Sequence, residues 1–144
     1  MTWLVNEPLS WAATIRFVHE RAHNCCEYCL TCQRIIGQPM HIDHIIPGAG
    51  NHPDNLALAC ASCNLSKYDA VSGIDPESGS EVALFNPRMQ NWHEHFEWID
   101  GGCRIQGLTP TGRATVGRLD MNQERVVIAR LLWIQAKAHP PNLP

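Results

Sequence analysis

The sequence is poor in charged residues and lacks any long apolar run. Of its 144 residues, 17% are charged and 7% are aromatic. No apolar stretch approaches the ~18 residues of a membrane span, and no block of like charge indicates a disordered tail. The first residues carry no basic region ahead of an apolar stretch, so we expect no secretory signal. These absences predict a soluble cytoplasmic protein with no membrane partner.

A strongly basic composition is also missing. The 11 basic residues are outnumbered by 14 acidic ones, giving a formal net charge of −3, which is not typical of a strongly basic nucleic-acid binder. From Arg104 onward, however, six basic side chains accompany two acidic ones, a net charge of +4. This excess, which includes Arg113 and Arg118, indicates a surface that contacts DNA phosphates. Solvated helix faces explain the same charges equally well.

The seven cysteines are grouped in a way that favours a metal site. Six of them lie in two short segments, 25–32 and 60–63. Without a secretory signal they are expected to stay reduced, which argues against disulfides. Each segment contains a CxxC pair, and two such pairs can supply four thiolates to a tetrahedral, structural Zn²⁺. Free buried cysteines and a redox CxxC are the alternatives, although no βαβ pattern surrounds either pair.

The apolar pattern predicts short helices and strands in mixed order, which is an α+β fold. A hydrophobic content of 44% in 144 residues suffices for one domain with its own core. Helices are expected at 11–22, 63–70, 110–119 and 122–138, with Ser10, Ser62 and Thr109 as N-cap residues. Strands are expected as hairpins over 34–46 and 92–108 and as a single strand over 82–85. The turn-rich stretches 47–55 and 72–80 are expected to be loops.

Polar residues able to carry chemistry lie between and beside the cysteine pairs. They form the segments HIDHIIP (41–47), DNL (54–56) and CNLSK (63–67). Together with the flanking CxxC pairs, and in this order, they resemble the HNH endonucleases, in the version with paired cysteine motifs around the active site. The resemblance covers residues 26–67. Three later segments, at 84–88, 92–96 and 107–115, are similar to the tail of a stand-alone bacterial group of HNH proteins.

The resemblance implies a ββα-metal core stapled by a four-cysteine zinc site. It favours Cys26 and Cys29 as ligands, beside Cys60 and Cys63, although Cys25 and Cys32 also lie in the first cysteine segment. The N-terminal helix and nuclease core would occupy residues 1–70. A hairpin and helical extension over 71–144 would pack on this core, so that the chain forms one compact domain.

The resemblance also implies a role for each residue of the motif. His44 would be the general base that activates water, because a neutral imidazole accepts a proton near neutral pH. Asp43 and Asn64 would hold Mg²⁺ or Mn²⁺ through oxygen atoms. Asn55 would orient the His44 ring, and Lys67 would contact a phosphate of the DNA substrate. The expected activity is metal-dependent hydrolysis of DNA phosphodiester bonds.

Simpler interpretations stay open for individual residues and for the whole chain. Adjacent residues of a regular strand point to opposite faces, so Asp43 and His44 share a site only if the strand ends or distorts there. His41 is a candidate for a supporting role, whereas packing and hydrogen bonding explain His95 more simply. The rival functions are a non-catalytic zinc-knuckle module that binds nucleic acid and a structural interaction protein.

Overall fold

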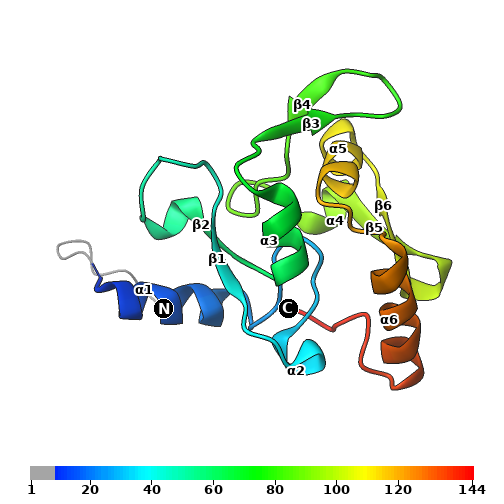
Figure 1. Cartoon of the computed structure of the whole chain (residues 1–144), viewed down its shortest axis with the longest axis horizontal. Coiled ribbons are helices and arrows are strands. Elements are labelled where there is room, and N and C mark those ends of the chain that lie inside the picture. Colours follow the sequence, from blue (N-terminus) through cyan, green and yellow to red (C-terminus); the bar gives the residue numbers. More distant parts are fainter. Residues whose placement is uncertain (1–8) are drawn as a thin grey trace.

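The computed structural model describes residues 9–144, and its elements form three small antiparallel sheets with helices between and beside them (Figure 1). The α+β fold class expected from the sequence is confirmed. Among residues 9–144, no helix is long and apolar enough to cross a bilayer. The start of the chain, on which the expectation of no secretory signal rests, lies outside the described residues.

The central unit is a two-stranded sheet followed by a helix. Strand β1 (His41–His44) pairs antiparallel with β2 (Leu56–Ala59), with His44 opposite Leu56. All four residues of β2 are buried, as expected for a strand inside the core. Helix α3 (Ala61–Lys67) follows directly, and the Cys60 sulfur caps it by accepting a hydrogen bond from the Cys63 amide at 3.4 Å. The helix predicted over 63–70 is therefore present, but it begins and ends earlier, and the predicted Ser62 cap is wrong because Cys60 is the N-cap residue.

The predicted hairpin over 34–46 is wrong. Residues 33–36 instead form one helical turn, α2 (Gln33–Ile36), which ends at Gly37 in the left-handed conformation that glycine adopts without steric cost. Strand β1 takes its partner from beyond the polar loop 47–55. Burial of the apolar β2 segment in the core outweighs the local preference of the β-branched residues near position 35.

The second half contains two more hairpins. Strand β3 (Ser72–Ile74) pairs with β4 (Glu81–Ala83), so part of the expected 72–80 loop is a strand. Strand β5 (Phe96–Ile99) pairs with β6 (Arg104–Gly107), which confirms the predicted hairpin, although its first residues form a helical turn, α4 (Trp92–His95).

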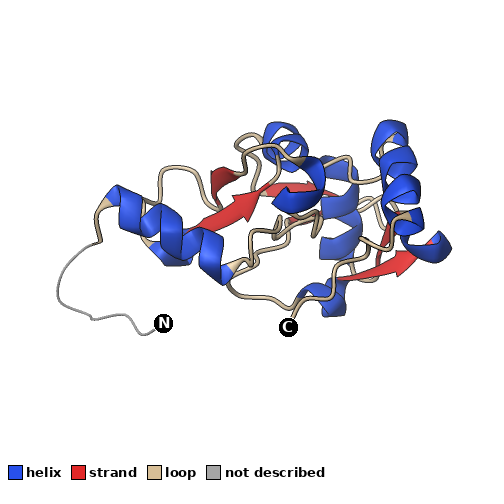
Figure 2. Cartoon of the chain, turned by 90° about the horizontal axis from the view of Figure 1, so that it is seen from below, coloured by secondary structure: helices blue, strands red, loops and turns tan. Residues whose placement is uncertain are grey.

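Three longer helices complete the fold. Helix α1 (Trp11–Arg21) begins at the predicted Ser10 cap, and α5 (Pro110–Arg118) begins at the predicted Thr109 cap. Helix α6 (Glu124–Gln135) is shorter at both ends than expected. In the views of Figures 1 and 2, α1 lies at one end of the molecule and α6 at the other, with the central unit between them.

One hydrophobic core joins the two halves of the chain. It contains apolar side chains from α1, β2, β5 and the segments that follow β4 and α5, among them Val18, Leu58, Phe85, Phe96 and Leu119. Polar contacts between the two halves of the chain accompany this core. The Trp92 indole donates to the Tyr28 carbonyl at 2.8 Å, and Arg88 pairs with Glu27. The C-terminal half is therefore packed against the segment that contains the first cysteine pair.

Candidate metal centre and active-site pocket

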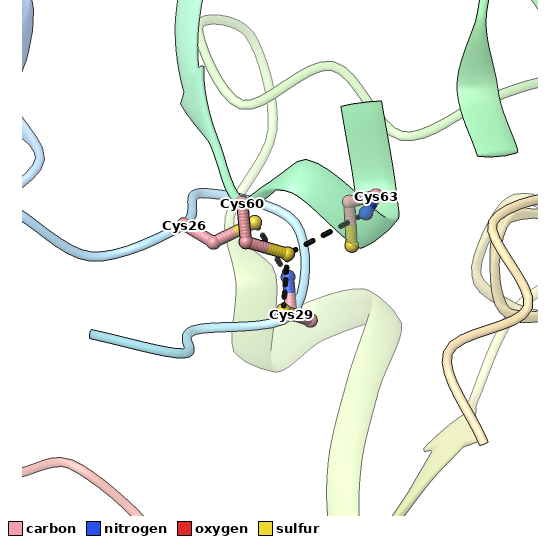
Figure 3. Close-up of side chains that lie close together, drawn as sticks. All are labelled: Cys26, Cys29, Cys60 and Cys63. Atoms are coloured by element: carbon pink, nitrogen blue, oxygen red, sulfur yellow. Dashed lines mark hydrogen bonds between the residues drawn. The ribbon is translucent and has the colours of Figure 1, made fainter. Parts of the chain in front are cut away.

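Four cysteines converge where the first cysteine segment meets the start of α3. The sulfur atoms of Cys26, Cys29, Cys60 and Cys63 lie within 4.8 Å of one another, and all four residues are buried (Figure 3). The Cys29 and Cys60 sulfurs are 3.6 Å apart. Around a tetrahedral zinc with Zn–S bonds of ~2.3 Å, the sulfurs would be about 3.8 Å apart. The donor set and spacing are thus compatible with a closed, structural zinc site.

The four-cysteine cluster also shows how neighbouring thiols influence one another. Burial raises the pKa of the Cys26 thiol, whereas hydrogen bonds from the other three thiols lower the pKa of Cys29. A thiol that ionises readily is a better ligand, because zinc binds the thiolate. The cluster ties the loop between α1 and α2 to the junction of β2 and α3.

The two remaining cysteines of the first segment form a disulfide, contrary to the expectation that all would be reduced. Cys25 and Cys32 face each other across an isolated antiparallel bridge, which brings their Cα atoms to 3.9 Å. Neither therefore belongs to the four-cysteine cluster. Cys103 is buried and is not paired with another cysteine.

A separate pocket of about 550 Å³ opens beside the end of β1 and the middle of α3. The polar and aromatic residues that line it are Asp43, His44, Asn51, Asn64, Tyr68 and Asp69. Asp43 and His44 are the last two residues of β1, and both line this pocket. The packing of α3 beside β1 brings Asp43 and Asn64, more than 20 positions apart in the sequence, to one cavity.

The His44 ring is held by a residue that sequence analysis missed. Its Nε2 lies 2.7 Å from the Asn51 side-chain oxygen. The Asn55 amide, which was expected to hold this ring, instead bonds the Ile46 amide and carbonyl and the Gly50 carbonyl, at 2.9–3.0 Å. The Asn55 assignment is corrected accordingly. Its donor and acceptor are engaged by the backbone of the loop that carries Asn51.

Asp43 is buried and hydrogen-bonded from two sides. The Tyr28 hydroxyl donates to it at 2.6 Å, and the Lys67 ammonium lies 3.1 Å from the same carboxylate oxygen. Burial and the adjacent Asp43 charge raise the pKa of Tyr28 well above its usual value, so this phenol stays protonated. Tyr28 is a second residue of the site that the sequence did not reveal, since it lies 15 positions from Asp43.

Lys67, which was expected to contact a phosphate, is instead buried. The residue is 1% exposed, and its ammonium also donates to the His44 and Ile45 carbonyls at 3.2 and 3.3 Å. The cause is the inward face of α3, which carries both Cys63 and Lys67 into the interior. Lys67 neutralises Asp43 and fastens α3 to the end of β1.

The two arginines expected on the DNA surface differ in their exposure and in their partners. Arg113 is engaged by Asp75, with its Nε 2.8 Å from one carboxylate oxygen, and by Glu77 at 3.2 Å. Its expected role as a free DNA contact is therefore corrected. Arg118 is exposed, at the end of α5, and its guanidinium lies 3.4 Å from the Lys67 carbonyl.

The other histidines lie apart from the pocket. His41 is exposed and does not line the cavity. The His95 Nδ1 lies 2.6 Å from the Thr109 hydroxyl, and its ring packs on Phe85. A packed, hydrogen-bonded role explains His95.

Strands β1 and β2 and helix α3 form a ββα unit that the four-cysteine cluster links to the first cysteine segment. This unit presents imidazole, carboxylate and amide groups to one pocket. Residues 26–70 match the family model described as HNH endonuclease. No curated protein and no solved structure matches the chain. Nucleic acid is the substrate class that this family implies.

Proposed function

We propose that the protein is a metal-dependent endonuclease that hydrolyses phosphodiester bonds of DNA. The observation that carries the proposal is the convergence of Asp43, His44 and Asn64 on one pocket inside the segment that matches the HNH family. The match alone supports a nuclease-type function. The three side chains supply the groups that hydrolysis requires: a base and two oxygen ligands for a cation.

His44 is the proposed general base. The Asn51 oxygen accepts a hydrogen bond from Nε2, which selects the tautomer whose Nδ1 is unprotonated. Nδ1 then takes the proton from the attacking water. Asn55 supports this geometry indirectly, because it closes the loop that positions Asn51.

The pocket requires a cation before it can accept a phosphate. Asp43 and Asp69 both line it, no Lys or Arg of the described residues is among its lining side chains, and the Lys67 ammonium is buried and paired with Asp43. Carboxylate and amide oxygens from Asp43 and Asn64 suit Mg²⁺ or Mn²⁺, which typically take few protein ligands and keep several waters. When bound, such an ion stabilises the charge that develops on the phosphate and the leaving oxygen.

The remaining groups support this site rather than react. Tyr28 and Lys67 fix the Asp43 carboxylate, so that its remaining lone pairs face the pocket in one orientation. The four-cysteine zinc site holds α3, and with it Asn64, against the first cysteine segment. Arg118 is the proposed phosphate contact outside the pocket.

The test of the proposed cation site is a metal titration of plasmid cleavage by the wild type and two Asn64 variants. Asn64→Ala should lose activity at low Mn²⁺ and recover part of it at high Mn²⁺, because mass action offsets a lost ligand. Asn64→His should stay active, since imidazole is also a metal ligand. Metal-independent cleavage, or an Asn64→Ala variant with an unchanged metal titration, would contradict the assignment. Binding of DNA without any cleavage would favour the zinc-knuckle binding module.

A further inference from the structure

Helix α3 and the residue that follows it carry two strongly exposed apolar side chains, Leu65 and Tyr68, and Tyr68 lines the pocket. Leu65 and Tyr68 are 77% and 76% exposed, and within residues 9–144 only Met89 is a more exposed large apolar residue. Tyr68 directly follows α3, and its amide still donates a helical hydrogen bond to the Asn64 carbonyl at 3.0 Å. We call this pair the Leu65–Tyr68 ridge.

Folding does not explain the tyrosine at this position. Tyr68 has φ 51° and ψ −111°, and the Ala70 amide bonds the Lys67 carbonyl at 2.9 Å. These values describe a type II′ turn with Tyr68 at the position that glycine favours. A large side chain there costs conformational energy and, being exposed, regains little by packing. An exposed leucine alone would be ordinary.

The ridge lies where a polymeric substrate must pass. Tyr68 lines the same pocket as His44 and Asn64. A phosphodiester placed at His44 therefore brings its flanking nucleotides against Tyr68. Neither ridge residue carries a charge, and the nearby Asp69 repels phosphate, so bases rather than the backbone are the groups that the ridge can hold.

We propose that Leu65 and Tyr68 act as an apolar wedge that enters between bases next to the cleaved bond, so that the preferred substrate is duplex DNA with locally weakened stacking. The inference rests on the proposed function. Apolar wedges in nucleic-acid-binding proteins unstack base steps at an energetic cost. That cost is smallest at a mismatched or unpaired base, and stacking on an aromatic ring is tolerant of sequence.

The experiment measures binding of two duplexes of one sequence, fully paired or with a central mismatched bubble, by fluorescence anisotropy. All proteins carry His44→Ala so that the DNA stays intact. The protein with an unchanged ridge should bind the bubble ~5- to ~100-fold more tightly, the range expected for one aromatic stack. Tyr68→Ala and Leu65→Ala should reduce this ratio towards one. Tyr68→Phe, which keeps the ring, and Leu132→Ala, at an exposed position of α6, should preserve it.

The outcomes separate the wedge from the proposed function. Equal affinity for both duplexes in every protein, together with cleavage by the wild type, overturns the wedge and leaves the nuclease intact. A bubble preference that survives both alanine variants also overturns it, because the preference then arises elsewhere. Failure of the wild type to bind or cleave either duplex overturns both. Zinc content and circular dichroism show that each variant is folded.

Discussion

Individual side chains in this protein are fixed mainly by partners that are distant in sequence. Asp43 is held by Tyr28 and Lys67, and His44 by Asn51. The sequence indicated Asp43, His44 and Asn64, because their order and spacing resemble a known motif. It did not indicate Tyr28 or Asn51, since nothing in the local pattern shows that a tyrosine or a loop asparagine will meet these groups.

Arg113 gives a prediction at the same scale. Its hydrogen bonds hold the pKa of the Asp75 carboxyl well below the usual range. Because the pKa of Asp75 is lower in the folded protein than in the unfolded chain, the pair stabilises the protein above about pH 4, the pKa of an unfolded aspartate. This stabilisation is lost as the pH falls further and the carboxylate becomes protonated. Arg113→Gln should therefore lower the melting temperature at pH 7, and the difference from wild type should shrink below about pH 4.

The matched control is Arg104→Gln. Arg104 pairs with Asp100 at 3.5 Å, but both side chains are about half exposed, so this pair contributes little. An Arg113 difference that stays constant from about pH 7 to about pH 2 would show that the stabilisation does not come from the Asp75 charge.

At the scale of elements, two capped helices and the last hairpin followed from the sequence. Ser10 and Thr109 start α1 and α5 as expected, and the β5–β6 hairpin turns near Gly101. The partner of β1 was predicted wrongly, because neighbouring β-branched residues cannot show that a segment beyond the following loop is more deeply buried. The burial of Lys67 was missed for a similar reason: it depends on which face of α3 packs on β1.

At this scale, the four-cysteine cluster leads to a prediction about zinc content and melting temperature. Purified protein should contain about one zinc per chain by elemental analysis. Cys60→Ser should lose zinc and melt roughly 10 °C or more below the wild type, because a structural zinc contributes directly to folding. Cys103→Ser is the control, since this buried thiol lies outside the cluster and should leave zinc content unchanged. Zinc-free protein that melts at the wild-type temperature would contradict the claim that zinc at the four-cysteine cluster stabilises the fold.

For the whole molecule, the basic excess of the C-terminal third is partly used inside the protein. Arg113 is paired, and Arg130 is fully buried, donating to the Cys103 and Met121 carbonyls. Arg118 remains exposed, with its guanidinium 3.4 Å from the Lys67 carbonyl. Counting charges along the sequence therefore overstated the surface available to DNA. The division at residue 70 stays a prediction, while the shared core shows that the two segments pack together.

The salt dependence of DNA binding tests whether the exposed Arg118 contacts a DNA phosphate. Each phosphate contact contributes about 0.9 to the slope of log K against log salt concentration. Arg118→Gln should reduce the slope by about that amount, whereas Arg16→Gln, at an exposed position of α1, should leave it unchanged. Equal slopes for wild type and Arg118→Gln would remove Arg118 from the proposed DNA surface.

The most direct test of the central claim is cleavage of supercoiled plasmid in Mg²⁺ or Mn²⁺ by the wild type, His44→Ala and, as a control, His41→Ala. His41 belongs to the same strand but is exposed outside the pocket. If His44 is the general base, its loss should reduce the cleavage rate by ~10²-fold or more, while DNA affinity and zinc content stay the same and His41→Ala cleaves like the wild type. Equal cleavage by wild type and His44→Ala would contradict the account.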